Sequence, residues 1–231
     1  MDAQFIYRLL LLLGPLLASL TVHEFAHART ALAFGDTTAQ RQGRCTLNPL
    51  AHLDPIGTLV LIVTQFIGWA RPVPVNPNNL QPRRIGDIAV SLAGPMSNLG
   101  LAMLCGIGLK ALHAAVGAPE TPLQQAGYLL LGVTMMANLG LFMFNLIPLF
   151  PLDGHHILRE ALPTTNHRVQ FMQWQMRYGA IALAVLIFAP RVLEMMLRRE
   201  VFSPIRWLYL HVAGFVVQTF GLEAALPYMI I

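Results

Sequence analysis

Long apolar runs alternate with short polar segments along this chain. The runs cover residues 5–34, 85–109, 127–149, 178–197 and 204–222, and a shorter run covers 58–70. A helix needs about 20 apolar residues to span a bilayer. The long runs therefore predict membrane helices, although Pro190, Arg191 and Glu194 weaken the fourth. The run 58–70, with 13 residues, predicts a re-entrant or partly inserted segment.

The polar segments between these runs predict turns and one strand pair. Residues 36–47 are polar and contain Gly43, which suits either a short hairpin or a plain loop. Residues 71–84 hold four prolines and predict a non-helical loop. The fold class we expect is an all-α polytopic membrane protein of about 4–6 membrane helices or re-entrant segments, with a small membrane-associated β hairpin near 36–47. It forms one domain over 1–231, with a core over 5–160 and C-terminal helices over 173–222.

Composition supports the membrane assignment. The chain is 55% hydrophobic and 11% charged, whereas a soluble domain is about 25% charged. The net charge of +4 rests almost entirely on arginine. In a membrane protein such an excess sets orientation rather than binding nucleic acid. Cys45 and Cys105 form no C-x-x-C, so neither a disulfide framework nor a cysteine zinc site is indicated.

The sequence His23-Glu24-Phe25-Ala26-His27 lies inside the first apolar run. Residues four apart share one face of a helix, so both imidazoles can reach one metal ion. Glu24 can then point at a metal-bound water and take its proton, which is the H-E-x-x-H zinc hydrolase arrangement. A lone helical histidine is usually a core residue, but ionisable groups at membrane depth mark functional sites.

This motif supplies two ligands, and catalytic zinc usually has three from the protein. The third apolar run ends in a break between Pro148 and Pro151, followed by Asp153-Gly154. An Asp-Gly pair alone would indicate a turn. Backbone freed at membrane depth is tolerated only where it is buried or lines a polar cavity, which favours Asp153 as the third ligand. The next candidates are His52, which we interpret as an ordinary polar residue, and His155 and His156, which we interpret as polar residues at the membrane surface.

The second apolar run carries Gly94 and Asn98 near its start. Small residues there allow close helix approach, and a buried asparagine needs a partner. An interhelical hydrogen bond and a substrate contact are both open for Asn98. If the first run enters the membrane, the second leaves and the third returns, then Gly94 and Asn98 meet the histidines and Asp153 at one face.

Most arginines of the loops gather at this face, whereas the opposite loop has only Lys110 and Glu120. The positive-inside rule then places the site toward the cytoplasmic side of the inner membrane. If the run 178–197 spans the membrane, Arg198, Arg199 and Arg206 break this rule locally.

The motif at 23–27, together with Asn145-x-x-Pro148-x-x-Pro151-Leu152-Asp153-Gly154, resembles the site-2 protease family of intramembrane zinc metalloproteases. Gly94-x-x-x-Asn98 fits the middle motif of that family, and residues 48–57 resemble its compact bacterial members. The resemblance covers roughly residues 15–160 of this chain.

This resemblance implies one Zn²⁺ per chain, held by His23, His27 and Asp153, with Glu24 as general base. It implies a role for Asn145 in substrate or oxyanion binding, and substrate contacts at Gly94 and Asn98. The implied substrate is a transmembrane protein, cleaved within or near its spanning helix. No insertion is long enough for a PDZ or CBS domain.

A divalent-metal transporter is the alternative, because it also places histidine and glutamate on a membrane helix. Such a pathway usually needs ionisable residues in several spanning helices, and the runs 85–109 and 127–149 offer mainly asparagines. The expected partners are the lipid bilayer and a membrane-anchored substrate. Homo-oligomer formation, the substrate and the activating signal are left open.

Overall fold

A computed structural model describes residues 3–64 and 69–229, without the side chains of residues 3–10, 12, 61, 63 and 64. The described residues are mostly helical. In chain order the helices are α1 (Ala3–Ala33), α2 (Thr38–Arg41), η1 (Pro49–Ala51), α3 (Pro55–Thr64), η2 (Pro77–Asn79), α4 (Arg83–Val116), α5 (Pro122–Asn145), α6 (Asp153–Ala161), α7 (Asn166–Leu197), α8 (Pro204–Phe220), η3 (Glu223–Ala225) and α9 (Leu226–Met229).

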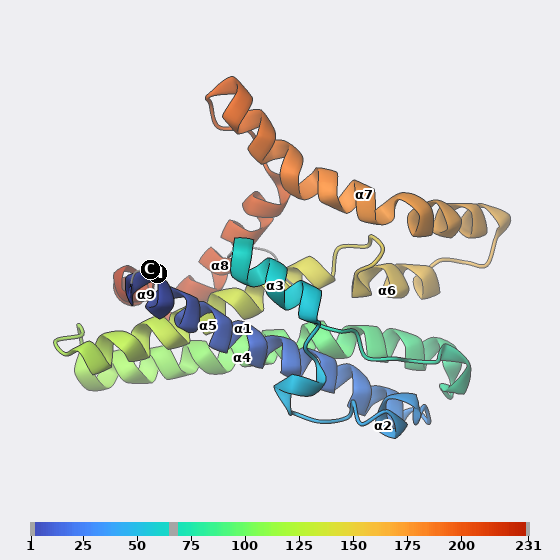
Figure 1. Cartoon of the computed structure of the whole chain (residues 1–231), viewed down its shortest axis with the longest axis horizontal. Coiled ribbons are helices and arrows are strands. Elements are labelled where there is room, and N and C mark those ends of the chain that lie inside the picture. The colour runs from blue at the N-terminus through green and yellow to red at the C-terminus, as the bar shows by residue number, and fades with distance from the viewer. Residues whose placement is uncertain (1–2, 65–68, 230–231) are drawn as a thin grey trace.

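Three long helices, α1, α4 and α5, pack against one another and form the centre of the molecule (Figure 1). Helix α4 contacts both of the others, and α6 lies along its first half. A buried apolar cluster joins α4 and α5 to α8 and α9 through Leu109, Tyr128, Met135 and Leu139. The N-terminal half of α4 instead faces α1, which brings the predicted middle motif to the histidines.

Local sequence signals explain how α4 and α5 end and begin. Helix α4 continues past the predicted boundary at 109 and ends where Gly117 adopts a φ of 64°, a conformation that favours glycine. Helix α5 opens with Pro122 at its first turn and a reciprocal capping box between Thr121 and Gln124. The link between these two helices is therefore short, because only residues 117–121 lie between the end of α4 and the start of α5.

Among the fully described helices, α4, α5 and α7 are long and apolar enough to cross a membrane. Helix α8 joined to the η3–α9 segment, bent by 111°, would make a fourth. These findings support a multi-pass membrane protein. The predicted span of the first apolar run corresponds to α1, whose first side chains lie outside the described residues. Helix α3 has 10 residues, fewer than the about 20 needed to span.

The predicted β hairpin near 36–47 is not present: α2 occupies Thr38–Arg41, and no strand occurs in the described part of the chain. Asp36 explains the difference, because its carboxylate accepts hydrogen bonds from the backbone N–H and the hydroxyl of Thr38. Such a side-chain bond offers the backbone an alternative to strand pairing. An antiparallel bridge joins Leu53, before α3, to Ala70, after it.

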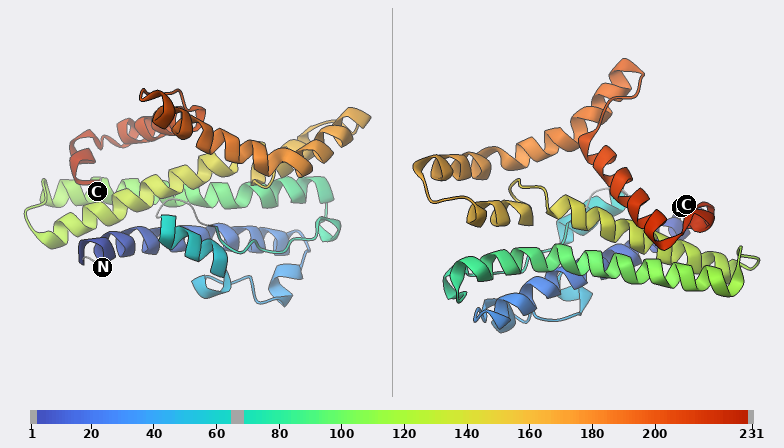
Figure 2. Two further views of the ribbon diagram at one scale, coloured as in Figure 1. Left: turned by 45° about the horizontal axis from the view of Figure 1, so that its top comes forward. Right: turned by 180° about the vertical axis from the view of Figure 1, so that it is seen from behind.

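Helix α7 extends away from the three-helix centre, and α8 returns from the end of α7 to pack on α4 and α5 (Figures 1 and 2). Helix α7 packs mainly against α8, and most of its apolar side chains are exposed. Exposed apolar surface of this extent is expected where lipid surrounds a helix. Helix α7 approaches the site in its first half, through Gln175 and Gly179.

Candidate metal centre

Three predicted ligands, His23, His27 and Asp153, lie together although they come from α1 and the start of α6. Their ligand atoms all lie within 4.8 Å of one another. The two Nε2 atoms are 3.0 Å apart. The Asp153 carboxylate lies 3.3 Å from His23 Nε2 and 3.4 Å from His27 Nε2.

Hydrogen bonds at the far side of each ring decide which nitrogen carries the proton. His23 Nδ1 lies 2.6 Å from Asn98 Oδ1, and His27 Nδ1 lies 2.7 Å from the Val90 carbonyl. Both oxygens can only accept, so both Nδ1 atoms donate. In neutral imidazoles the two Nε2 lone pairs then converge with the carboxylate of Asp153. A bound cation is the natural partner for acceptors arranged in this way.

Asn98 is fully buried, and each of its polar atoms has a partner. Its Oδ1 accepts from His23, while its Nδ2 donates to Asn138 Oδ1 at 2.8 Å and to the Ser19 carbonyl at 3.3 Å. Asn138 donates in turn to the Ser19 hydroxyl at 2.7 Å. This network joins α1, α4 and α5 and orients the imidazole of His23. Of the two roles open for Asn98, the structure contains the interhelical hydrogen bond, and a substrate contact stays a prediction.

Gly94 lies directly against both imidazoles. A Cβ at this position would lie 2.3 Å from His27 Nε2 and 2.7 Å from His23 Nε2. No side chain fits there, so glycine keeps open the space between the two ligand nitrogens. A substrate contact at Gly94 likewise stays a prediction.

Three separate observations indicate that these residues can bind a metal ion. The donor set of two imidazoles and one carboxylate is one that zinc uses in hydrolytic sites. Asp153 Oδ2 is buried and has no hydrogen-bond partner among the described residues. The glycine opposite the ligands preserves a space that any Cβ would fill.

Glu24 lies beside this group rather than in it. Its Oε2 accepts a hydrogen bond from the backbone N–H of Val73 at 2.8 Å. The carboxylate also interacts electrostatically with His27 and with Arg44. This placement suits a proton acceptor next to the ligands.

Asp153 reaches the histidines because the chain breaks between α5 and α6. Gln175 of α7 is fully buried and supports this break, accepting from the Phe150 N–H at 3.1 Å and donating to the Pro148 carbonyl at 3.0 Å. Gly154 allows close approach, since a Cβ there would lie 2.4 Å from two carbonyl oxygens of the α5 end. Sequence reasoning missed Gln175, because a glutamine in the polar stretch 159–177 carries no distinguishing signal.

Asn145 lies in the last turn of α5, where its side chain donates to the Leu141 carbonyl at 3.0 Å. Its proposed substrate role stays a prediction. His155 is buried beside Gln175 rather than at the membrane surface, with its Nδ1 2.8 Å from Gln175 Oε1. His156 lies on the same helix. Burial and the charge of Arg159 lower the pKa of His156.

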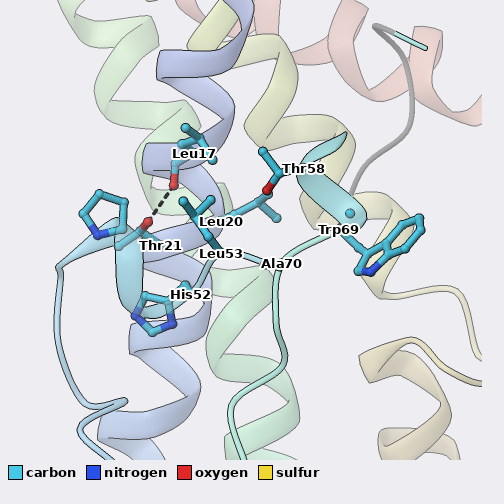
Figure 3. A pocket seen from close by; sticks show the side chains of 10 residues that line it. Leu17, Leu20, Thr21, His52, Leu53, Thr58, Trp69 and Ala70 are labelled. Atoms are coloured by element: carbon cyan, nitrogen blue, oxygen red, sulfur yellow. Dashed lines mark hydrogen bonds between the residues drawn. The ribbon is translucent and has the colours of Figure 1, made fainter. Parts of the chain in front are cut away.

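His52 lies in a small pocket beside α1 (Figure 3). Its Nε2 lies 2.8 Å from the Thr46 carbonyl, and its buried Nδ1 has no hydrogen-bond partner among the described residues. Leu17, Leu20 and Thr21 line the pocket from α1, and the Thr21 hydroxyl bonds back to its own helix. The pocket volume is about 10 Å³, close to the space that one water needs. The group of metal-type ligands among the described residues does not include His52.

Together, the apolar multi-pass fold and this ligand group define a class: a membrane protein with a metalloprotease-type site. The profile of Peptidase family M50 matches residues 110–189, which include Asp153. The chain is 44% identical over 179 residues to "Putative zinc metalloprotease YwhC" of Bacillus subtilis, covering 76% of this chain and 78% of that relative. It is 33% identical over 206 residues to "Putative zinc metalloprotease Rip2" of Mycolicibacterium smegmatis, covering 87% of this chain and 73% of that relative.

This chain belongs to peptidase family M50, the site-2 protease family. A further relative of the same name from Mycobacterium tuberculosis is 30% identical over 213 residues, covering 84% of this chain and 70% of its own length. No solved structure matches the chain. Family membership and these relatives support a metalloprotease with a metal cofactor in the membrane.

Proposed function

We propose that this protein is a zinc-dependent intramembrane endopeptidase that cleaves peptide bonds within or near the transmembrane segments of membrane-anchored substrates. The observation that carries the proposal is the convergence of His23 Nε2, His27 Nε2 and the Asp153 carboxylate, with Gly94 leaving space between them. One Zn²⁺ per chain would occupy this position. When bound, zinc supplies Lewis acidity toward water and the scissile carbonyl.

Residues of the chain supply proton transfer, ligand orientation and substrate contact. Glu24 accepts the proton of the attacking water, and its carboxylate is held for this by the Val73 N–H. Asn98 and the Val90 carbonyl fix both imidazoles with their Nε2 atoms toward the metal position. The proposal also gives Asn145, in the last turn of α5, a substrate contact near the break that precedes Asp153.

The substrate and the orientation are part of the same proposal. A substrate helix must unwind before cleavage, because its carbonyls are hydrogen-bonded along the helix. The ligands lie at the end of the bundle that also carries Arg84, Arg159 and Arg168. By the positive-inside rule this end faces the cytoplasm in the inner membrane. Cysteine labelling of position 83 from outside only, in sealed cells, would contradict that orientation.

A decisive experiment uses purified enzyme in proteoliposomes and a quenched fluorescent peptide. The peptide carries a Leu/Ala-rich span of about 20 residues interrupted by Asn-Pro-Gly near one end. We expect wild-type enzyme to cleave it, and Glu24→Gln to lose cleavage while keeping its zinc, because Glu24 is a base and not a ligand. Zinc loss in Glu24→Gln would refute this role.

The transporter alternative is tested in the same vesicles by metal flux. Among the described residues, His23, His27 and Asp153 form the one group of three metal-type ligands. Asp87, the acid near the start of α4, is paired with Arg159. No second group continues a path across the bilayer in the described part of the chain. Flux without cleavage would favour transport.

A further inference from the structure

The peptide group between Pro72 and Val73 connects the proposed general base to the rest of the molecule. The Val73 N–H donates to Glu24 Oε2 at 2.8 Å. Pro72 and Pro74 flank Val73, and proline has no backbone N–H. This stretch therefore presents a single backbone donor, and that donor binds Glu24.

Arg44 lies at the other end of the same peptide group. Its Nη2 donates to the Arg71 carbonyl at 2.5 Å and to the Pro72 carbonyl at 3.4 Å. The Pro72 carbonyl and the Val73 N–H belong to one amide. A guanidinium thus lies at the carbonyl end of this amide, and the Glu24 carboxylate lies at its N–H end. Each charge polarises the amide in the direction that strengthens the other hydrogen bond.

The Arg44 side chain is buried rather than exposed at the surface. The residue is 6% exposed, and its Nε is buried without a hydrogen-bond partner among the described residues. Burial and the charge of Arg71 lower the pKa of Arg44, and the carboxylate of Glu24 opposes this. Burying a guanidinium costs free energy unless its charge is compensated. Glu24, reached through the amide, supplies that compensation.

The segment carrying this amide is fixed at both ends. The Arg71 N–H donates to the His52 carbonyl at 2.8 Å, and the Asn76 N–H donates to Asp36 Oδ2 at 2.7 Å. Between α3 and α4 this segment runs along the bundle toward the start of α4 (Figure 2). Val73 is thereby held against α1 at the position of Glu24.

We propose that Arg44 is a positioning residue for Glu24, acting through the Pro72–Val73 peptide group. With Oε2 bound to the Val73 N–H, the other carboxylate oxygen takes the proton of the attacking water. The same contact holds Glu24 outside the group of metal ligands. This inference rests on the proposed function, since it concerns the base of that reaction.

The test compares kcat, KM and zinc content of Arg44→Ala with wild type on the quenched transmembrane peptide. Removing partners that orient reacting groups typically lowers activity about 10- to 100-fold. We expect a loss of this size in kcat, with KM and zinc content unchanged. Methylguanidinium, added well below denaturing concentrations, should restore part of kcat. Arg41→Ala is the matched control, because Arg41 lies three residues earlier on α2 and is exposed.

A second variant tests the amide itself. Val73→Pro removes the N–H but keeps the guanidinium, and it should lower kcat as Arg44→Ala does. Groups in one hydrogen-bonded chain are non-additive, so the double variant should be no slower than the slower single variant. Thermal unfolding of each purified variant identifies any loss of fold, and Arg44→Lys then serves as the milder replacement, with an intermediate kcat expected.

Several results would overturn the proposal. A raised KM with unchanged kcat would make Arg44 a substrate contact, and lost zinc would make it part of the metal centre. Multiplicative losses in the double variant would refute the connection through the amide. Failure of wild-type enzyme to cleave the peptide would instead count against the proposed function, because the inference is judged from ratios between variants and wild type.

Discussion

Replacing Gly94 by alanine tests the metal centre at its most crowded point. The added methyl group would lie 2.3 Å from His27 Nε2, 2.6 Å from His23 Cε1 and 2.7 Å from His23 Nε2. Ordinary van der Waals contact begins at 3.4 Å, so the His27 contact is short by about 1 Å. Helix α4 is packed between α1 and α5 and cannot easily withdraw. The imidazoles must therefore turn away.

The consequence for the metal follows from bond lengths. Zinc binds histidine nitrogen at about 2.0–2.1 Å. Moving Nε2 by about 1 Å would therefore change the zinc–nitrogen distance by about half of its normal length. A misplacement of this size can cost about 100-fold in rate even in groups that do not bind the metal. Turning either ring also weakens its hydrogen bond to Asn98 or to the Val90 carbonyl. We expect Gly94→Ala to lose most of its zinc and at least about 100-fold in cleavage.

The assay is elemental analysis of zinc in purified protein, together with cleavage of the transmembrane peptide and thermal unfolding. Gly100→Ala is the matched control, because Gly100 lies on the same helix and its Cβ would meet no atom within 4 Å. That variant should keep zinc and activity, with a stability change of about 1 kcal/mol or less. Wild-type zinc content and activity in Gly94→Ala would refute the reasoning. Retained zinc with a raised KM would instead support the predicted substrate contact at Gly94.

Three further predictions concern the same region. Asn98→Ala should weaken zinc binding about 10- to 100-fold, measured by competition with a chelator, because His23 loses the partner that fixes its ring. Asp153→Ala should lose zinc and cleavage while still inserting in the membrane, and Asp153→Asn should be intermediate; zinc bound as tightly as in wild type would refute the ligand set. Burial would raise the pKa of Asp36, but hydrogen bonds from Thr38, Asn79 and the Asn76 N–H hold that pKa below its usual range. Its contribution to stability is therefore present above about pH 4 and lost as pH falls through the lower folded pKa, so unfolding temperatures of wild type should fall more steeply with acid than those of Asp36→Asn.

The grouping of His23, His27 and Asp153 could be predicted from the sequence, because it follows from residue spacing and from a helix break. Two histidines four residues apart on a helix can share one ion wherever the helix lies. Asp153 could be predicted because it follows a proline break at membrane depth. The backbone groups freed by such a break are tolerated only where they are buried or line a polar cavity. Asn98 was recognised as a polar group requiring a partner, but its partner lies 75 residues away in sequence. The sequence pattern alone did not decide between an interhelical hydrogen bond and a substrate contact for Asn98.

Other features depend on contacts that no local pattern encodes. The polar stretch 36–47 has the composition of a hairpin, yet Asp36 binds Thr38 and starts a short helix instead. Gln175 supports the break before Asp153 from another helix. The Val73 N–H reaches Glu24 through a backbone atom, and the side chain of a residue gives no sign of where its amide points.

The two sides of the metal centre are held by different parts of the fold. Both histidines come from α1 and are fixed by α4, through Asn98 and the Val90 carbonyl, with Asn138 of α5 completing the network. Asp153 instead follows a break that α7 supports, through the hydrogen bonds of Gln175 and the close approach of Gly179 to Phe150. Changes in the asparagine network should therefore disturb the imidazoles, whereas changes at Gln175 should disturb the carboxylate alone. A metal ion at this position needs both the imidazoles and the carboxylate as ligands. Its affinity therefore depends on how α6 and α7 pack against the central helices.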